Sequence, residues 1–136
     1  MQRATLLTAA TGATSAPSSA SDGVAITALT YTPPGIQRAN AAVLHVWSTA
    51  GSGTMDATFR LWGYIAAVSK WFPLGTGTGA TKGVINVGAA IDETGTDALR
   101  HAEVVDGLRA FSRVALQVTA IGGTSTAVSA ALEATA

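Results

Sequence analysis

Three long stretches of this chain carry no charged side chain, which restricts the elements that they can form. These stretches are residues 4–21, 39–55 and 114–132. The last one is long enough to cross a membrane, but Gln117 and the Gly122-Gly123 pair interrupt it. Between Val114 and Ala120, apolar residues alternate with other residues, as in a strand with one buried face. We therefore predict a hairpin over 114–132, with the glycine pair as its tight turn.

The rest of the chain repeats this pattern of short alternating segments separated by turns. In residues 57–65, Phe59 and Leu61 face one side, and Trp62 and Tyr64 face the other. The other segments that we expect to form strands are 24–31, 42–49, 70–72, 84–87 and 102–105. One helical turn is expected over 107–112, and no longer helix. This spacing predicts an all-β fold, a single-domain β-sandwich or jelly roll of about eight short antiparallel strands.

The first 22 residues differ in composition from the rest of the chain. Residues 10–23 are rich in Ser, Thr, Ala and Gly and contain Pro17, which is typical of a loop or a flexible arm. Residues 3–9 fit either a short strand or part of that arm. We therefore expect residues 1–22 to form an N-terminal arm, or a short strand plus a loop, ahead of a β-sandwich body over 23–136.

The charge balance and the absence of cysteine exclude several functional classes. Eight basic and eight acidic residues give a net charge of zero, whereas nucleic-acid binding favours a basic excess. Without cysteine there is neither a disulfide scaffold nor a thiolate metal site. We expect no direct contact with nucleic acid and no membrane segment.

No catalytic or cofactor motif stands out. The glycine-rich loop 75–83 lacks the Gly-Lys-Ser/Thr order that opens the helix of a phosphate-binding loop, so a flexible loop is expected there. The acidic residues of loop 90–101, Asp92, Glu93 and Asp97, lack the EF-hand spacing for calcium and indicate a solvated loop. His45 stands alone in a predicted strand. We predict no enzyme, no metal and no cofactor.

The three tryptophans are the best candidates for a binding role. Tryptophan on a sheet face can anchor an interface or stack on a sugar, and it can also fill a core. The alternation around Trp62 predicts that this side chain is exposed. For Trp47 and Trp71 we expect the core.

The missing charges also bear on the oligomeric state. Soluble monomers protect the edges of their sheets with Lys, Glu, Pro or bulges. The predicted hairpin has no charge between Arg113 and Glu133. An association that covers these edges, either a closed oligomer or a larger assembly, is therefore expected.

Two groups of segments carry a likeness to a known family. The first is 60–64 (RLWGY) followed by 70–75 (KWFPLG). The second is 106–111 (DGLRAF), 113–120 (RVALQVTA) and 123–124 (GT). Over roughly residues 24–133 the chain resembles small tailed-phage virion proteins, in particular capsid decoration or cement proteins of the jelly-roll type.

This resemblance implies a head-stabilising protein that binds the outer surface of a phage capsid and bridges coat subunits. It implies a virion location after synthesis in the host cytoplasm, no cofactor, and two partners: the major capsid protein and sister copies in a dimer or trimer. The residues expected at the partner surface are Trp62 and Tyr64 of the body, and Arg3, Leu6 and Leu7 of the N-terminal segment.

A second interpretation is a phage fibre or a carbohydrate-binding β-sandwich module. In that case Trp62 and Tyr64 would form a platform on which sugars stack. An enzyme is the least favoured class, because no catalytic constellation is visible.

Overall fold

The computed structural model describes residues 2–26, 30–31, 37–38, 41–48, 55–87, 100–123 and 128–134. The strands are β1 (Gln2–Ala10), β2 (Val24–Ala25), β3 (Thr30–Tyr31), β4 (Gln37–Arg38), β5 (Ala42–Ser48), β6 (Met55–Ile65), β7 (Lys70–Pro73), β8 (Val84–Val87), β9 (Arg100–Val105), β10 (Arg113–Gly123) and β11 (Val128–Ala134). The 3₁₀ turns whose bounds lie within the described ranges are η2 (Ala66–Val68), η3 (Gly79–Thr81) and η5 (Leu108–Ala110). The expected helical turn over 107–112 is confirmed as η5.

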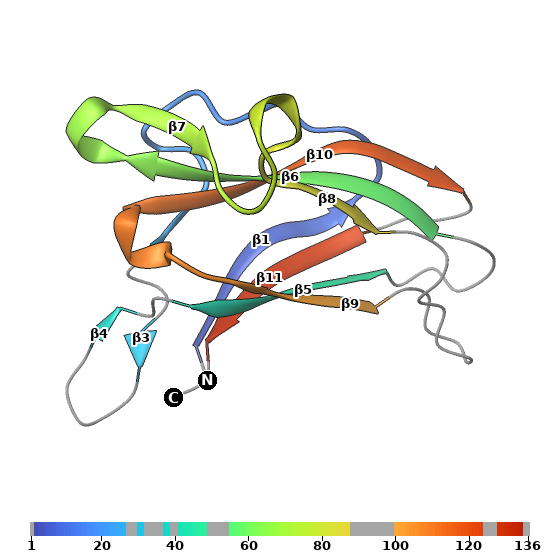
Figure 1. The fold of residues 1–136 in the computed structure, drawn as a ribbon. Coiled ribbons are helices and arrows are strands. Elements are labelled where there is room, and N and C mark those ends of the chain that lie inside the picture. Colours follow the sequence, from blue (N-terminus) through green and yellow to red (C-terminus); the bar gives the residue numbers. More distant parts are fainter. Residues whose placement is uncertain are drawn as a thin grey trace.

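Two antiparallel sheets face each other across one core (Figure 1). Sheet A has the order β1-β11-β5-β9. Sheet B has the order β2-β10-β6-β7, with β8 also paired to β6, and β3 and β4 form a separate two-stranded pair. The expected all-β, antiparallel sandwich is confirmed.

Side-chain alternation explains how the sheets bury one face each. On β6, Phe59 and Leu61 are fully buried, and on β5 Leu44 and Val46 are fully buried. These inward residues meet side chains of the same kind on β10 and β11 in one apolar cluster. Complete burial of such a side chain stabilises the fold by about 1.5–3 kcal/mol.

The predicted hairpin over 114–132 is wrong. β10 belongs to sheet B and β11 to sheet A, so the chain passes from one sheet to the other after Gly123. β11 lies between β1 and β5. β10 pairs with β6 on one side; on its other side, β2 pairs with it, and Thr14 exchanges hydrogen bonds with Val118. Both strands are therefore interior, which explains why they need no charged residues.

The N-terminal segment begins as a strand of sheet A. Residues 2–10 form β1, which pairs with β11, and Ala4 is buried in the core. The pairing is irregular after Thr5, and Ala9 has a left-handed φ of 47°. The amide of Ala9, displaced from the ladder, instead donates to the Ser129 hydroxyl at 3.0 Å. Bulges of this kind twist an edge strand away from regular pairing.

The other described edges are also protected. β9 carries charged residues, and its Glu103 occupies an inward position opposite Leu44. β7 ends in Pro73, which has no amide hydrogen to donate. β2 has two residues and β8 has four. Our premise that the uncharged strands leave unprotected edges is therefore wrong for the described part of the sandwich.

Candidate functional site

The outer face of sheet A carries a cluster of four side chains, Arg3, His45, Trp47 and Glu133. The Arg3 guanidinium forms a salt bridge with the Glu133 carboxylate, which also lies 3.9 Å from His45 Nδ1. The ring centroids of His45 and Trp47 are 4.8 Å apart, and Arg3 Cζ lies 5.7 Å from the centre of the Trp47 ring. One positive and one negative charge cancel within the cluster, so it adds no net charge to this face.

The positions around this cluster are mixed: Ser129 and Arg100 stand opposite Trp47 on the two neighbouring strands, and two exposed valines lie on the same face. Val43 and Val104 occupy opposite positions on β5 and β9 and are 37% and 66% exposed. Ala131, directly opposite His45 on β11, is fully buried. The expectation that Trp47 fills the core is wrong: it is only partly buried and lies on the outer face, because residues of odd number on β5 point away from the core.

The outer face of sheet B carries Trp62, which is partly buried beside polar side chains. Its Nε1 donates to Gln117 Oε1 at 3.0 Å, and Arg60 Cζ lies 4.8 Å from the centre of its ring. Arg60 in turn donates to the backbone carbonyls of Lys82 and Gly79, at 2.9 and 3.3 Å. The loop 75–83, expected to be flexible, is thus tied to the sheet by this arginine.

Tyr64 is not available as a stacking surface. It is 8% exposed, and the Trp71 ring packs on it with a centroid distance of 5.1 Å. Trp71 Nε1 also donates to the Ser19 carbonyl at 3.0 Å, so this tryptophan holds the 18–23 segment against the outer face. The expectation that Trp71 lies in the core is therefore wrong. The segment 18–23 is held there by Arg113, whose guanidinium donates to three of its carbonyls.

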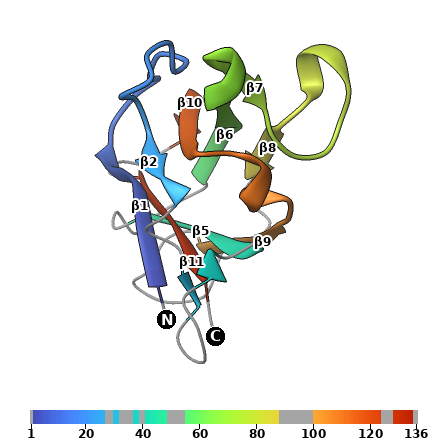
Figure 2. The same ribbon diagram turned by 90° about the vertical axis from the view of Figure 1, so that its left-hand side faces the viewer.

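These contacts place two chain segments on the outer side of sheet B. Figure 2 shows the 11–23 segment and the 75–83 loop on opposite sides of β10 and β6. Within the first segment, the amides of Ser18 and Ser19 donate to the Asp22 carboxylate, both at 2.9 Å, and lower the pKa of that carboxyl group below its usual value.

Of the three N-terminal residues expected at a partner surface, only Arg3 lies on an outer face. Leu6 and Leu7 are partly buried and pack against the core. They also line a cavity of about 360 Å³ between β1, β10 and residues 14–18. Their main role in the fold is therefore packing.

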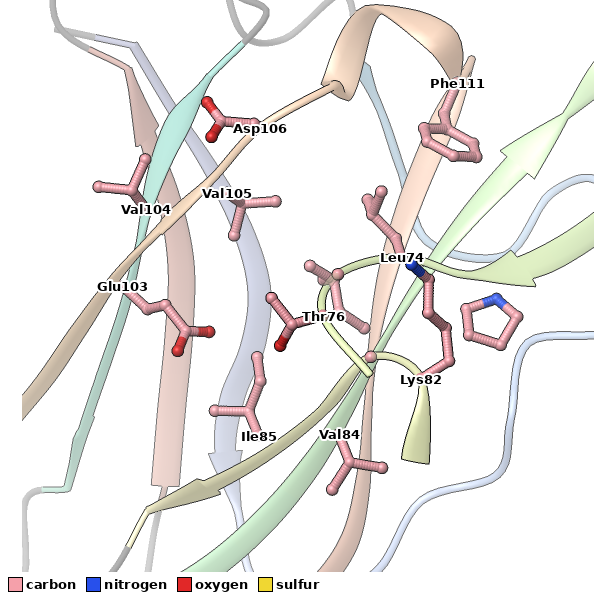
Figure 3. Close-up of a pocket in the computed structure, with 14 residues that line it drawn as sticks. Leu74, Thr76, Lys82, Val84, Ile85, Glu103, Val104, Val105, Asp106 and Phe111 are labelled. Atoms are coloured by element: carbon pink, nitrogen blue, oxygen red, sulfur yellow. The ribbon is translucent and has the colours of Figure 1, made fainter. Parts of the chain in front are cut away.

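A pocket of about 520 Å³ opens between β8 and β9, at the side of the sandwich. Its walls include Leu74, Ile85 and Val105, and its polar lining includes Lys82 and Glu103. Figure 3 shows Glu103 and Val105 projecting from β9 toward Ile85, while Val104 projects the other way. Two carboxylates, Glu103 and Asp106, and one lysine thus line the pocket over an apolar floor.

The described residues contain no group of three or more His, Asp or Glu side chains that could hold a metal ion. The acidic residues Asp92, Glu93 and Asp97 lie outside the described residues. None of the helical turns in the described ranges has the length and hydrophobicity needed to cross a membrane. No family model matches this chain, and comparisons with curated proteins and with solved structures give no match.

The functional residues that the sequence patterns missed could have been found from the register of paired strands. The sequence pattern did not pair His45 with Glu133, and it identified Gln117 only as a polar interruption of an apolar run. They stand on outward positions of neighbouring strands, and strand alternation identifies such positions. Which strands are neighbours could not be read from the sequence.

Proposed function

We propose that this chain is a structural protein of a bacteriophage particle that binds the outer surface of the capsid. It stabilises the shell by bridging coat subunits, and sister copies associate on the same lattice as dimers or trimers. It uses no cofactor. The sequence resemblance given above and the chemistry of the outer face of sheet A support this proposal.

The observation that carries it is the combination, on that face, of exposed apolar residues with an ion pair. Val43, Val104 and Trp47 offer apolar surface, and the Arg3–Glu133 pair already neutralises its own charges. Aromatic anchors and a scarcity of unpaired charge are typical of the central part of protein–protein interfaces. A flat sheet face of this kind suits a partner that is itself a broad protein surface.

The mode of binding follows from the protected edges. Because the described edges are bulged, charged or short, the partner meets a face of the sandwich and does not add a strand to it. Many copies that each bind weakly would together hold neighbouring coat subunits, since multivalent attachment multiplies the effective affinity.

The test uses purified shells assembled from the major coat protein of the phage that, under this proposal, encodes the chain. The full chain should sediment with these shells and raise their melting temperature in calorimetry. Val104→Asp should abolish both effects, because burying an unpaired carboxylate in an interface costs several kcal/mol. Val68→Asp is the matched control: Val68 is 53% exposed in η2, away from sheet A, and its replacement should leave binding unchanged.

Both variants should fold, because each replaces an exposed side chain. If the wild-type chain fails to sediment with the shells, the capsid function is refuted. If Val104→Asp binds the shells as well as Val68→Asp does, the outer face of sheet A is not the binding surface, even if the capsid function is right.

A further inference from the structure

The two outer faces of the sandwich differ in chemistry, which indicates different ligands. The outward side chains on the strands of sheet B near Trp62 combine hydroxyl, amide and guanidinium groups with the apolar Val84, Ala115 and Pro73. Besides these three, they include Thr58, Arg60, Trp62, Asn86, Gln117 and Thr119. Among the outward residues of this sheet whose side chains are described, none is acidic, although Asp56 holds an outward position near the start of β6.

The exposed apolar residues are also distributed unequally between the outer faces of sheet A and sheet B. Four large apolar side chains are exposed among the described residues: Val43, Val68, Phe72 and Val104. Two of them lie on the outer face of sheet A. None stands beside Trp62, because Val68 belongs to η2 and Phe72 pairs with Gly63 on the inward register. No large exposed apolar side chain therefore stands beside Trp62, whose direct cross-strand neighbours are the partly buried Pro73 and Ala115.

Trp62 is held in a fixed orientation before any ligand arrives. Its indole N–H is bonded to Gln117, and the Arg60 guanidinium rests against its ring. Arg60 is fixed by two carbonyls of the 75–83 loop. A site whose side chains are already ordered loses less conformational entropy on binding.

The remaining hydrogen-bonding capacity lies next to the ring. The Gln117 carbonyl oxygen is occupied by Trp62, which leaves the amide NH₂ of Gln117 as a donor with no partner among the described residues. The Thr58 hydroxyl and the Asn86 amide are joined at 3.3 Å, and both are accessible on the same face. A partly exposed aromatic ring is thus bordered by the planar groups of Gln117 and Arg60, and the Thr58–Asn86 pair lies farther along the same face, beyond Arg60.

This combination suits a neutral saccharide. One face of a pyranose ring presents C–H groups, which pack on the face of an indole, while hydroxyls around the ring edge bond to amide and guanidinium groups. We propose that the outer face of sheet B is a saccharide-binding site centred on Trp62, with Gln117 and Arg60 as the hydrogen-bonding residues. Tyr64 serves as support beneath Trp71 and does not touch the sugar.

The test is calorimetric titration of the full chain with three neutral hexasaccharides: cellohexaose, chitohexaose and maltohexaose. At least one should bind saturably, and Trp62→Ala should weaken that binding by about tenfold or more. Trp47→Ala is the control on the opposite face and should bind the sugar as the wild type does. Gln117→Ala provides a milder second variant, with an affinity between the two.

Three results overturn the proposal. One is that none of the three sugars binds. Another is that Trp62→Ala, folded by circular dichroism, binds undiminished. The third is that only heparin, added as a polyanion control, binds with an affinity that falls steeply with salt, since the face would then recognise charge. This site does not depend on the capsid proposal, because the sheet A variant Val104→Asp should leave sugar binding intact.

Discussion

Thr14 forms hydrogen bonds with the edge of β10 that does not pair with β6. The loss of stability on replacing Thr14 with valine measures how much these hydrogen bonds protect that edge. The Thr14 amide donates to the Val118 carbonyl, and the Val118 amide donates to the Thr14 hydroxyl, both at 2.9 Å. Valine has nearly the same shape and keeps the first bond but removes the acceptor of the second. Because Val118 is fully buried, its amide would be left without a partner.

The expected loss follows from that unpaired amide. An ordinary hydrogen bond contributes about 0.5–1.5 kcal/mol net, whereas a buried donor left unsatisfied costs about 1–3 kcal/mol. We therefore expect Thr14→Val to lower the free energy of unfolding by about 2 kcal/mol. Urea unfolding followed by tryptophan fluorescence measures this change, and the m-value should stay constant if the native fold is kept.

Thr119→Val is the matched control. The Thr119 hydroxyl donates to the Thr58 carbonyl at 3.0 Å on the exposed face, where water can replace it. Its loss should cost about 0.5 kcal/mol or less. If the two variants differ by less than that, water already reaches the Val118 amide. The edge of β10 would then be open, and association through strand edges would regain its support.

Two further predictions concern packing and pH. Gly63→Ala places a Cβ within 2.8 Å of three ring atoms of Phe111, so overpacking should cost about 1–3 kcal/mol, seen as a lower melting temperature. The amides of Ser18 and Ser19 lower the pKa of Asp22 in the folded state, so its contribution to stability is present above the unfolded pKa and is lost as pH falls through the folded one. The wild type should therefore be more stable than Asp22→Asn near neutral pH and should lose that advantage in acid. Urea unfolding of both proteins at several pH values measures the difference. A difference in stability that does not change with pH would contradict the lowered pKa of Asp22 as its cause.

Local sequence patterns predicted where the strands lie better than they predicted which strands pair with one another. The alternation of Phe59 and Leu61 correctly identified β6 and its buried face. The glycine pair Gly122-Gly123 was interpreted as a hairpin turn, yet the strands on either side of it belong to different sheets. A short connection between two alternating strands looks the same whether the second strand pairs with the first or crosses the core. Only long-range pairing, such as Ala131 with His45, distinguishes the two cases.

The predictions of which aromatic side chains are buried failed for a related reason. Alternation assigns a side chain to a face, but it does not reveal what covers that face. Tyr64 points outward as predicted, yet Trp71 and the 18–23 segment lie over it. Trp47 points outward on β5 and has no such cover among the described residues, so it stays partly exposed. The candidate surface on sheet A was therefore invisible until the strand order was known.

The scarcity of charge now has a cause inside the fold, and this changes where a partner is to be sought. β10 and β11 lack charged residues between Arg113 and Glu133 because each lies between other strands or segments of its own sheet. An interior strand gains nothing from a charge and would have to desolvate it. The residues that remain free to recognise a partner stand on the outward registers, where Trp47 and Trp62 occupy opposite faces of one sandwich. Variants at these two positions should therefore separate two binding activities, whereas changes along the strand edges should alter stability and leave both activities in place.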